Sequence, residues 1–142
     1  MSAGSQANTG AGGEVERSGR SFLKVTVPLF TVLTVLFFWR YAWSPATTVS
    51  DPGDPLFLIW TMEWVRRALF HAPRELFDAP MFHPLPDVLA YSDPLIPQAL
   101  VAAPLRFIGF GPIAAYNAVY LGGIAGSGVL TAHLFLGGRE RR

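Results

Sequence analysis

The stretch "PIAAYNAVYLGGIAGSGVLTAHLFL", residues 112–136, decides the fold because it contains no Asp, Glu, Lys or Arg. At about 1.5 Å per residue, a helix of this length exceeds the roughly 30 Å hydrocarbon core of a bilayer. It predicts a transmembrane helix over residues 112–137. The composition agrees, since 51% of the 142 residues are hydrophobic and only 15% are charged. A net charge of +1 gives no basic surface that would indicate a nucleic-acid partner.

A second apolar stretch covers residues 22–43 and predicts the first transmembrane helix. Residues 1–20 before it are rich in Gly, Ser and Ala and have little to bury, so we expect a disordered tail. Basic residues stand at the outer ends of both apolar stretches: Arg17, Arg20, Lys24, Arg139, Arg141 and Arg142. Because basic flanks stay in the cytoplasm, we expect both termini there, with residues 138–142 as a basic tail.

The segment between the two apolar stretches, residues 44–111, is rich in proline and acidic residues. Eleven of the 12 prolines lie between positions 45 and 112, together with seven acidic residues and four arginines. This proline density excludes a spanning helix, so we expect a large extracytoplasmic loop. Two shorter apolar stretches in it, about residues 55–71 and 94–108, predict helices that lie on the membrane surface. The predicted fold is an all-α membrane protein with two transmembrane helices joined by this loop.

Small residues recur every four positions in the second apolar stretch and form a stripe along one side of the expected helix. They are Ala114, Ala118, Gly122 and Gly126. Helix backbones approach closely along such a stripe. Asn117 and His133 would be costly facing lipid, so we expect both to face protein. The first span cannot cover all of these positions, which predicts further transmembrane helices, in a longer parent chain or in a partner subunit.

Two aspartates stand directly before the apolar segment that begins at residue 56, in the sequence Asp51-Pro52-Gly53-Asp54-Pro55. In a structural interpretation, Asp54 is the N-cap of a helix and Pro55 its first residue, and Asp93 followed by proline repeats the arrangement. In a functional interpretation, carboxylates held at the membrane surface act as a general base or bind a divalent cation. The two interpretations are compatible, because a cap can still present one oxygen outward.

Three segments together suggest a family: "GDPLFLIWTMEW", "LFDAPMFHPLPDVLAYSDPLIPQAL" and "GPIAAYNAVYLGGIAGSG". With the first span they resemble the N-terminal portion of bacterial multi-pass membrane glycosyltransferases of the GT-C superfamily. The resemblance covers about residues 22–137. It implies an enzyme of the bacterial inner membrane that moves a sugar, with inversion, from a polyprenyl-phosphate donor to an extracytoplasmic acceptor. Because such enzymes have many more spans, this chain by itself is expected to be inactive.

The resemblance also assigns roles to particular residues. The catalytic loop carboxylate falls on Asp54, with Asp51 as the next candidate and Asp93 as a weaker, substrate-binding one. Members of the family differ in whether they need a divalent cation, so the resemblance leaves the metal requirement open, with a divalent cation as the candidate cofactor. The implied partners are the bilayer, the lipid-linked sugar and further transmembrane helices.

Other candidate substrate contacts each have a simpler alternative. Arg66 and Arg67 have the guanidinium geometry to hold a lipid phosphate, or they extend to lipid headgroups as interfacial residues do. Trp60 can stack on a sugar or belong to the aromatic belt at the membrane interface. The rival to the enzyme is a non-enzymatic membrane hairpin, an assembly or accessory subunit that docks through its small-residue stripe. A transporter fragment is favoured less, because neither span carries a charge in its middle.

Overall fold

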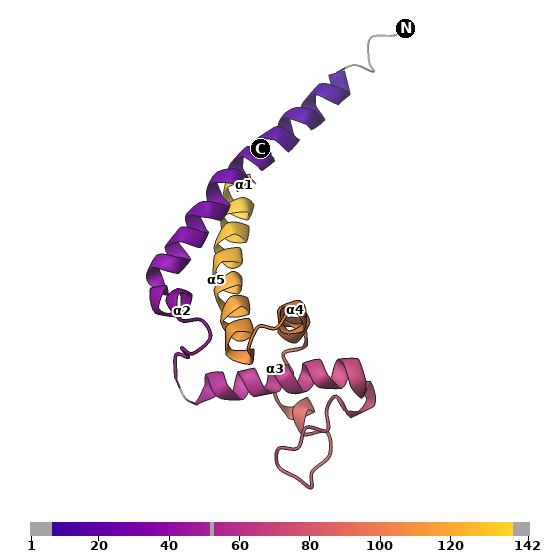
Figure 1. The fold of residues 1–142 in the computed structure, drawn as a ribbon. Helices are drawn as coiled ribbons and strands as arrows, with labels where there is room; N and C mark the ends of the chain where they lie inside the picture. The colour runs from indigo at the N-terminus through magenta and orange to yellow at the C-terminus, as the bar shows by residue number, and fades with distance from the viewer. Residues whose placement is uncertain (1–6, 52, 138–142) are drawn as a thin grey trace. The chain divides into compact units, whose positions relative to one another are not determined.

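The computed structural model describes residues 7–51 and 53–137, and these form helices joined by turns and loops, with no β-strand among them. The main helices are α1 (Ala7–Phe37), α2 (Trp39–Trp43), α3 (Asp54–His71), α4 (Ile96–Phe107) and α5 (Pro112–Gly137) (Figure 1). Two short 3₁₀ helices, η1 (Pro73–Glu75) and η2 (Val88–Tyr91), lie in the loop between α3 and α4. The predicted all-α class is confirmed. The chain forms two compact units: the first contains α1 and α5 from Leu121 onward, and the second runs from Arg40 to Tyr120.

One described helix is long and apolar enough to cross a membrane, and it is Pro112–Phe135 within α5. Its 24 residues span about 36 Å at 1.5 Å per residue. The apolar part of α1, Phe22–Phe37, is shorter than a typical span. The expected helix over residues 22–43 is interrupted at Phe38, although the Phe38 amide still donates to the Thr34 carbonyl at 2.9 Å.

Helix α1 begins at Ala7, inside the segment for which the sequence predicts a disordered tail. Residues 1–6 and the basic tail at residues 138–142 lie outside the described part of the chain. Once the apolar part of α1 has formed, each residue added to the helix needs no new nucleus. The Ala, Glu and Arg residues of this segment favour helix and its four glycines disfavour it, so propensity alone does not explain the extension over residues 7–20.

In the first unit, α1 packs against α5 at a glycine outside the predicted small-residue stripe. A Cβ at Gly128 would lie 2.3 Å from Cδ1 of Phe30, so any larger residue there requires the Phe30 ring to move. At Gly122 and Gly126 an added Cβ would meet no described atom within 4 Å, so the α1–α5 contact at Gly128 does not extend to a close approach at these two glycines. The prediction that His133 faces protein holds only in part: its ring lies 6.1 Å from that of Phe22, yet the residue is exposed.

In the second unit, α3 and α4 cross and enclose a small core with the start of α5 (Figure 1). Its members are Met62, Val65, Ala79, Leu89, Ala99, Ala102 and Ala115. Three of these are alanines at the α4 and α5 contacts, which lets the helices approach closely. The predicted inward position of Asn117 is confirmed, because it is 1% exposed and its Nδ2 donates to the carbonyls of Pro45 and Thr48 at 2.8 Å each.

The helix caps differ from the predicted ones. Helix α3 begins one residue earlier than predicted, so Gly53 is its N-cap and Asp54 lies in its first turn. The amides of Leu56 and Phe57 donate to the Gly53 carbonyl, and no side chain caps the helix. Asp93 does not cap α4 either, since α4 starts at Ile96 with Leu95 as its N-cap. Pro97 in the first turn of α4 sets this start, because proline at that position has no amide to satisfy.

Candidate functional site

Asp54 is exposed in the first turn of α3, and no hydrogen bond or ion pair joins its carboxylate to any described residue. A carboxylate in the first turn is favoured by the partial positive charge of the helix N-terminus. Pro55 at the next position fixes the backbone there. The local sequence therefore holds Asp54 in place while leaving both of its oxygens open to a ligand.

Asp51 has a different environment, although it is also exposed. Its Oδ1 accepts a hydrogen bond from the Gly53 amide at 2.6 Å. This short contact shapes the turn that leads into α3 and occupies one carboxylate oxygen. The geometry thus favours Asp54 over Asp51 as the residue that acts on a ligand.

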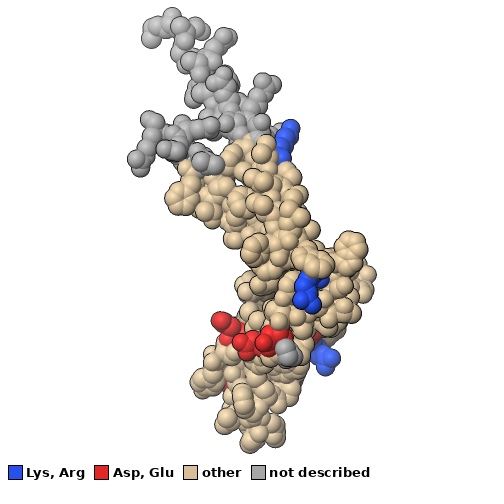
Figure 2. Space-filling view, turned by 90° about the vertical axis from the view of Figure 1, so that its left-hand side faces the viewer, with Lys and Arg blue, Asp and Glu red and all other residues tan. Residues whose placement is uncertain are grey.

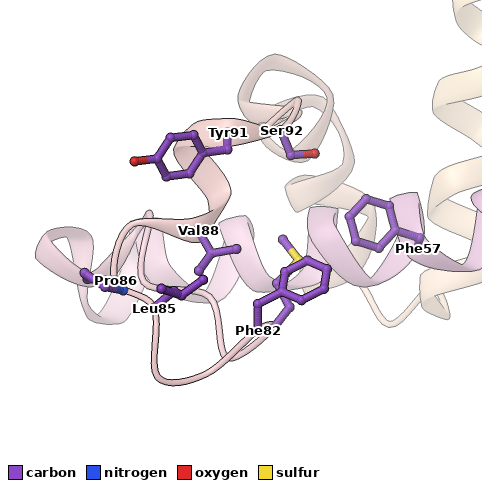
Figure 3. Close-up of a pocket in the computed structure, with 8 residues that line it drawn as sticks. Phe57, Phe82, Leu85, Pro86, Val88, Tyr91 and Ser92 are labelled. Carbon is purple, nitrogen blue, oxygen red and sulfur yellow. The ribbon is translucent and has the colours of Figure 1, made fainter.

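An apolar hollow of about 460 Å³ lies between α3 and the loop that follows it. It is lined by Phe57, Met81, Phe82, Leu85, Pro86, Val88, Tyr91 and Ser92. Figure 3 shows Phe57 reaching from α3 toward Phe82, while the hydroxyl of Tyr91 points outward. Asp54 and Phe57 are three residues apart on one helix and therefore neighbours on its surface. Asp54 itself does not line the hollow, but it lies one helical turn before Phe57, which does.

Asp93 directly follows Ser92, which lines the same hollow. It is exposed, and no hydrogen bond or ion pair joins it to a described residue. The structure thus brings the segments carrying Asp54 and Asp93 to one hollow, although 38 residues separate them in the sequence. On the face drawn in Figure 2, Asp and Glu side chains gather in one patch and Lys and Arg side chains stand singly.

A row of aromatic rings continues along α3 from this hollow. The ring of Trp60 lies 6.2 Å from that of Phe57 and 6.3 Å from that of Trp64, with interplanar angles of 23° and 17°. A second, smaller hollow of about 210 Å³ is lined by Trp60, Glu63, Trp64, Arg67 and Pro80. Two residues that the sequence marks as candidate substrate contacts, Trp60 and Arg67, thus share one hollow.

Arg66, the third such candidate, is bound within the protein. Its Nη2 donates to Oε2 of Glu63 at 3.0 Å. Arg106 of α4 binds the same carboxylate: its Nε donates to Oε1 at 2.6 Å, and its Nη2 donates to Oε2 at 3.2 Å. Burial would raise the pKa of Glu63, but the hydrogen bonds and charges of Arg106 and Arg66 outweigh it and hold the pKa below its ordinary value of 4.5. Arg106 also donates to the Phe110 carbonyl. The network ties α3 to α4 and to the turn before α5.

No local pattern in the sequence predicts this network of ion pairs. A helical wheel places Glu63 and Arg66 on a water-facing arc, and nothing local indicates that Arg106 reaches them from 43 residues away. The described residues also contain no group of three His, Asp or Glu side chains that lie close enough together to hold a metal ion.

Comparison with known proteins adds no family to this description. No protein-family model matches the chain. Searches of the curated proteins and of the solved structures find no match either.

Proposed function

We propose that this chain is the N-terminal, membrane-embedded portion of a glycosyltransferase that moves a sugar from a polyprenyl-phosphate donor to an extracytoplasmic acceptor. The observation that carries the proposal is the open carboxylate of Asp54, which is exposed in the first turn of α3, one turn before Phe57 of the apolar hollow. A general base needs an oxygen that is free to take a proton and a fixed position relative to its substrate. Asp54 has unpaired oxygens and a backbone position restricted by Pro55, and the resemblance described above supplies the reaction.

In the proposed step, Asp54 takes the proton of the acceptor hydroxyl. The hydroxyl oxygen attacks the anomeric carbon of the sugar, and the bond from that carbon to the phosphate oxygen breaks. Polyprenyl phosphate leaves with the electron pair of that bond. One displacement inverts the anomeric configuration. The exposed apolar side chains of the larger hollow, such as Phe82 and Leu85, give the lipid-linked substrate an apolar surface beside the base.

The proposal places the chain in a bacterial inner membrane with both termini in the cytoplasm. Helix α5 is one span, and the apolar end of α1 with α2 is the other. The chain contains no cysteine, so single cysteines can report its topology. In intact cells, a membrane-impermeant maleimide should label Ser50→Cys and should label Ser18→Cys only after lysis. Labelling of Ser18→Cys in intact cells would contradict this orientation.

The catalytic proposal is tested by sugar transfer in membranes that contain the full protein and labelled polyprenyl-phosphate hexoses. Asp54→Asn should lower the rate by about 10²–10⁴-fold, the usual contribution of a general base. Glu75→Gln is the matched control, because Glu75 is an exposed carboxylate of the same unit with no described partner. It should transfer sugar at the normal rate. Full activity of Asp54→Asn would refute the assignment.

A second function has one specific observation in its favour. An added Cβ at Gly122 or Gly126 would meet no described atom within 4 Å, so this part of the small-residue stripe has room for another transmembrane helix. An assembly subunit needs such a surface, as does an enzyme with further spans. If the chain is an assembly subunit, Gly122→Leu and Gly126→Leu should abolish crosslinking to a partner protein while Asp54→Asn has no effect. Unchanged crosslinking in both leucine variants would exclude this function.

A further inference from the structure

The smaller hollow on α3 combines a cation with a wall of aromatic rings. Arg67 lies one turn after Glu63 and Trp64 and two turns after Trp60, so the four side chains share one face of the helix. Pro80 closes the hollow from the loop. Its volume of about 210 Å³ is below the roughly 300–1,000 Å³ typical of sites for drug-sized ligands. The hollow therefore suits a single ring or a small charged group.

The charge of Arg67 is available to a ligand. Glu63 is the one carboxylate that lines the hollow, and both of its oxygens already accept hydrogen bonds from Arg106 and Arg66. No hydrogen bond or ion pair joins Arg67 to a described residue, and its side chain is exposed. Two guanidinium groups already neutralise this carboxylate, so the positive charge of Arg67 is not offset within the hollow. Such a site attracts a carboxylate or a phosphate, which a guanidinium binds through two parallel hydrogen bonds.

The aromatic wall is held in place before any ligand arrives. The indole Nε1 of Trp64 donates to the Leu76 carbonyl at 3.1 Å, and the Trp60 ring stacks on it at 17° between planes. The neighbouring loop is anchored as well, since Ala79 is buried and the Leu89 amide donates to the Phe77 carbonyl at 3.0 Å. A preformed site loses little conformational entropy when it binds. One anchored indole, a second indole stacked against it and a free guanidinium are therefore arranged for recognition.

We propose that this hollow binds one sugar ring that carries a negative charge, with the indoles of Trp60 and Trp64 against the C–H groups of the ring and Arg67 on its anionic group. The saccharide nature of the ligand rests on the proposed function. The anionic group can be the phosphate on a donor sugar or the carboxylate of a uronic acid in an acceptor. Both sources present the same chemistry to Arg67.

The test is equilibrium binding to the full chain in neutral detergent micelles, measured by calorimetry. Four probes separate the contributions: glucose 1-phosphate for a donor-type sugar, galacturonate for an acceptor-type sugar, glucose for stacking alone, and inorganic phosphate for charge alone. We expect one of the two charged sugars to bind at least about tenfold more tightly than glucose or phosphate. The tighter of the two identifies the source. Equal binding of phosphate and both sugars would overturn the proposal.

Variants assign the binding to this hollow. Arg67→Gln should weaken the preferred charged sugar by at least about tenfold. Trp60→Phe should keep binding and Trp60→Ala should lose it, because the aromatic face is what the ring contacts. Arg74→Gln is the matched control, since Arg74 is exposed in η1 and does not line the hollow. Binding that survives Arg67→Gln, or that Arg74→Gln weakens equally, would refute the site.

Two further outcomes separate this inference from others. If vesicles that contain phosphatidylglycerol displace the sugar and bind through Arg67 more tightly than it does, the hollow holds a lipid headgroup and the proposal fails. Binding requires no sugar transfer, so bound sugar in a protein without transferase activity overturns the proposed function alone. Transfer that proceeds without binding dependent on Arg67 overturns this inference alone.

Discussion

Replacing Asn117 by alanine should loosen the turn over residues 44–48 in the second unit. Asn117 is 1% exposed, and its two hydrogen bonds to the Pro45 and Thr48 carbonyls are each 2.8 Å long. A hydrogen bond contributes about 0.5–1.5 kcal/mol net, so the pair contributes about 1–3 kcal/mol. Alanine also removes the buried Oδ1, which has no described partner, and this offsets part of the loss. We expect a local destabilisation of about 2 kcal/mol, or about 30-fold in the opening equilibrium.

Amide hydrogen exchange reports this opening directly. The amides of Thr47 and Thr48 both donate to the Ser44 carbonyl, at 3.2 and 3.0 Å, so their exchange rates follow the stability of the turn. Both should exchange about 30-fold faster in Asn117→Ala. Ser127→Ala is the control, because it removes one exposed side-chain bond on the same helix and should leave both amides unchanged. A rise in the exchange rate below about threefold would contradict this prediction, since it would show that water replaces the two bonds at little cost.

Three further predictions test the packing. The pKa of Glu63 is lowered, so the stability that its ion pairs contribute is present above about pH 4.5 and is lost as the pH falls through the lowered pKa. Glu63→Gln should remove this loss of stability in acid, as measured by denaturation at a series of pH values. Gly128→Leu should destabilise the first unit by about 1–3 kcal/mol through overpacking, while Gly122→Leu, which meets open space, should change it by less than about 1 kcal/mol. Trp64→Phe should cost about 1 kcal/mol and make the loop after α3 more sensitive to protease, because the bond to the Leu76 carbonyl is lost. The first prediction is wrong if Glu63→Gln keeps the loss of stability in acid. The second is wrong if the two leucine variants destabilise equally, and the third if Trp64→Phe leaves proteolysis of the loop unchanged.

Local pattern in the sequence predicts most of the helical elements. Helices α3 and α5 fall within one residue of the ranges that the apolar stretches indicate, and α4 is slightly shorter at both ends. Prolines at positions 55, 97 and 112 stand in the first turns of these helices, where they are favoured. The position of Asn117 follows from the cost of a polar group in lipid. These predictions succeed because each depends on near neighbours in the chain.

The contacts that build the candidate site depend on distant residues and could not be predicted in this way. The ion pair between Glu63 and Arg106 joins residues 43 apart. The hollow beside Asp54 is formed when a loop rich in proline folds back on α3, and no period in the sequence encodes that. The close approach of α1 and α5 occurs at Gly128 because of where Phe30 lies, while the regular stripe through Gly122 stays open. The side chain on the facing helix, and not the regular spacing of small residues, decides which small residue allows a close helix contact.

The most direct test of the central claim is the rate of sugar transfer by Asp54→Glu beside Asp54→Asn, in membranes that contain the full protein. The carboxylate of Asp54 is exposed and has no described partner, so the longer glutamate can still reach the acceptor hydroxyl. The account predicts measurable transfer by Asp54→Glu and loss of about 10²-fold or more in Asp54→Asn. Equal rates in the two variants would contradict it, because a general base cannot be replaced by an amide without loss.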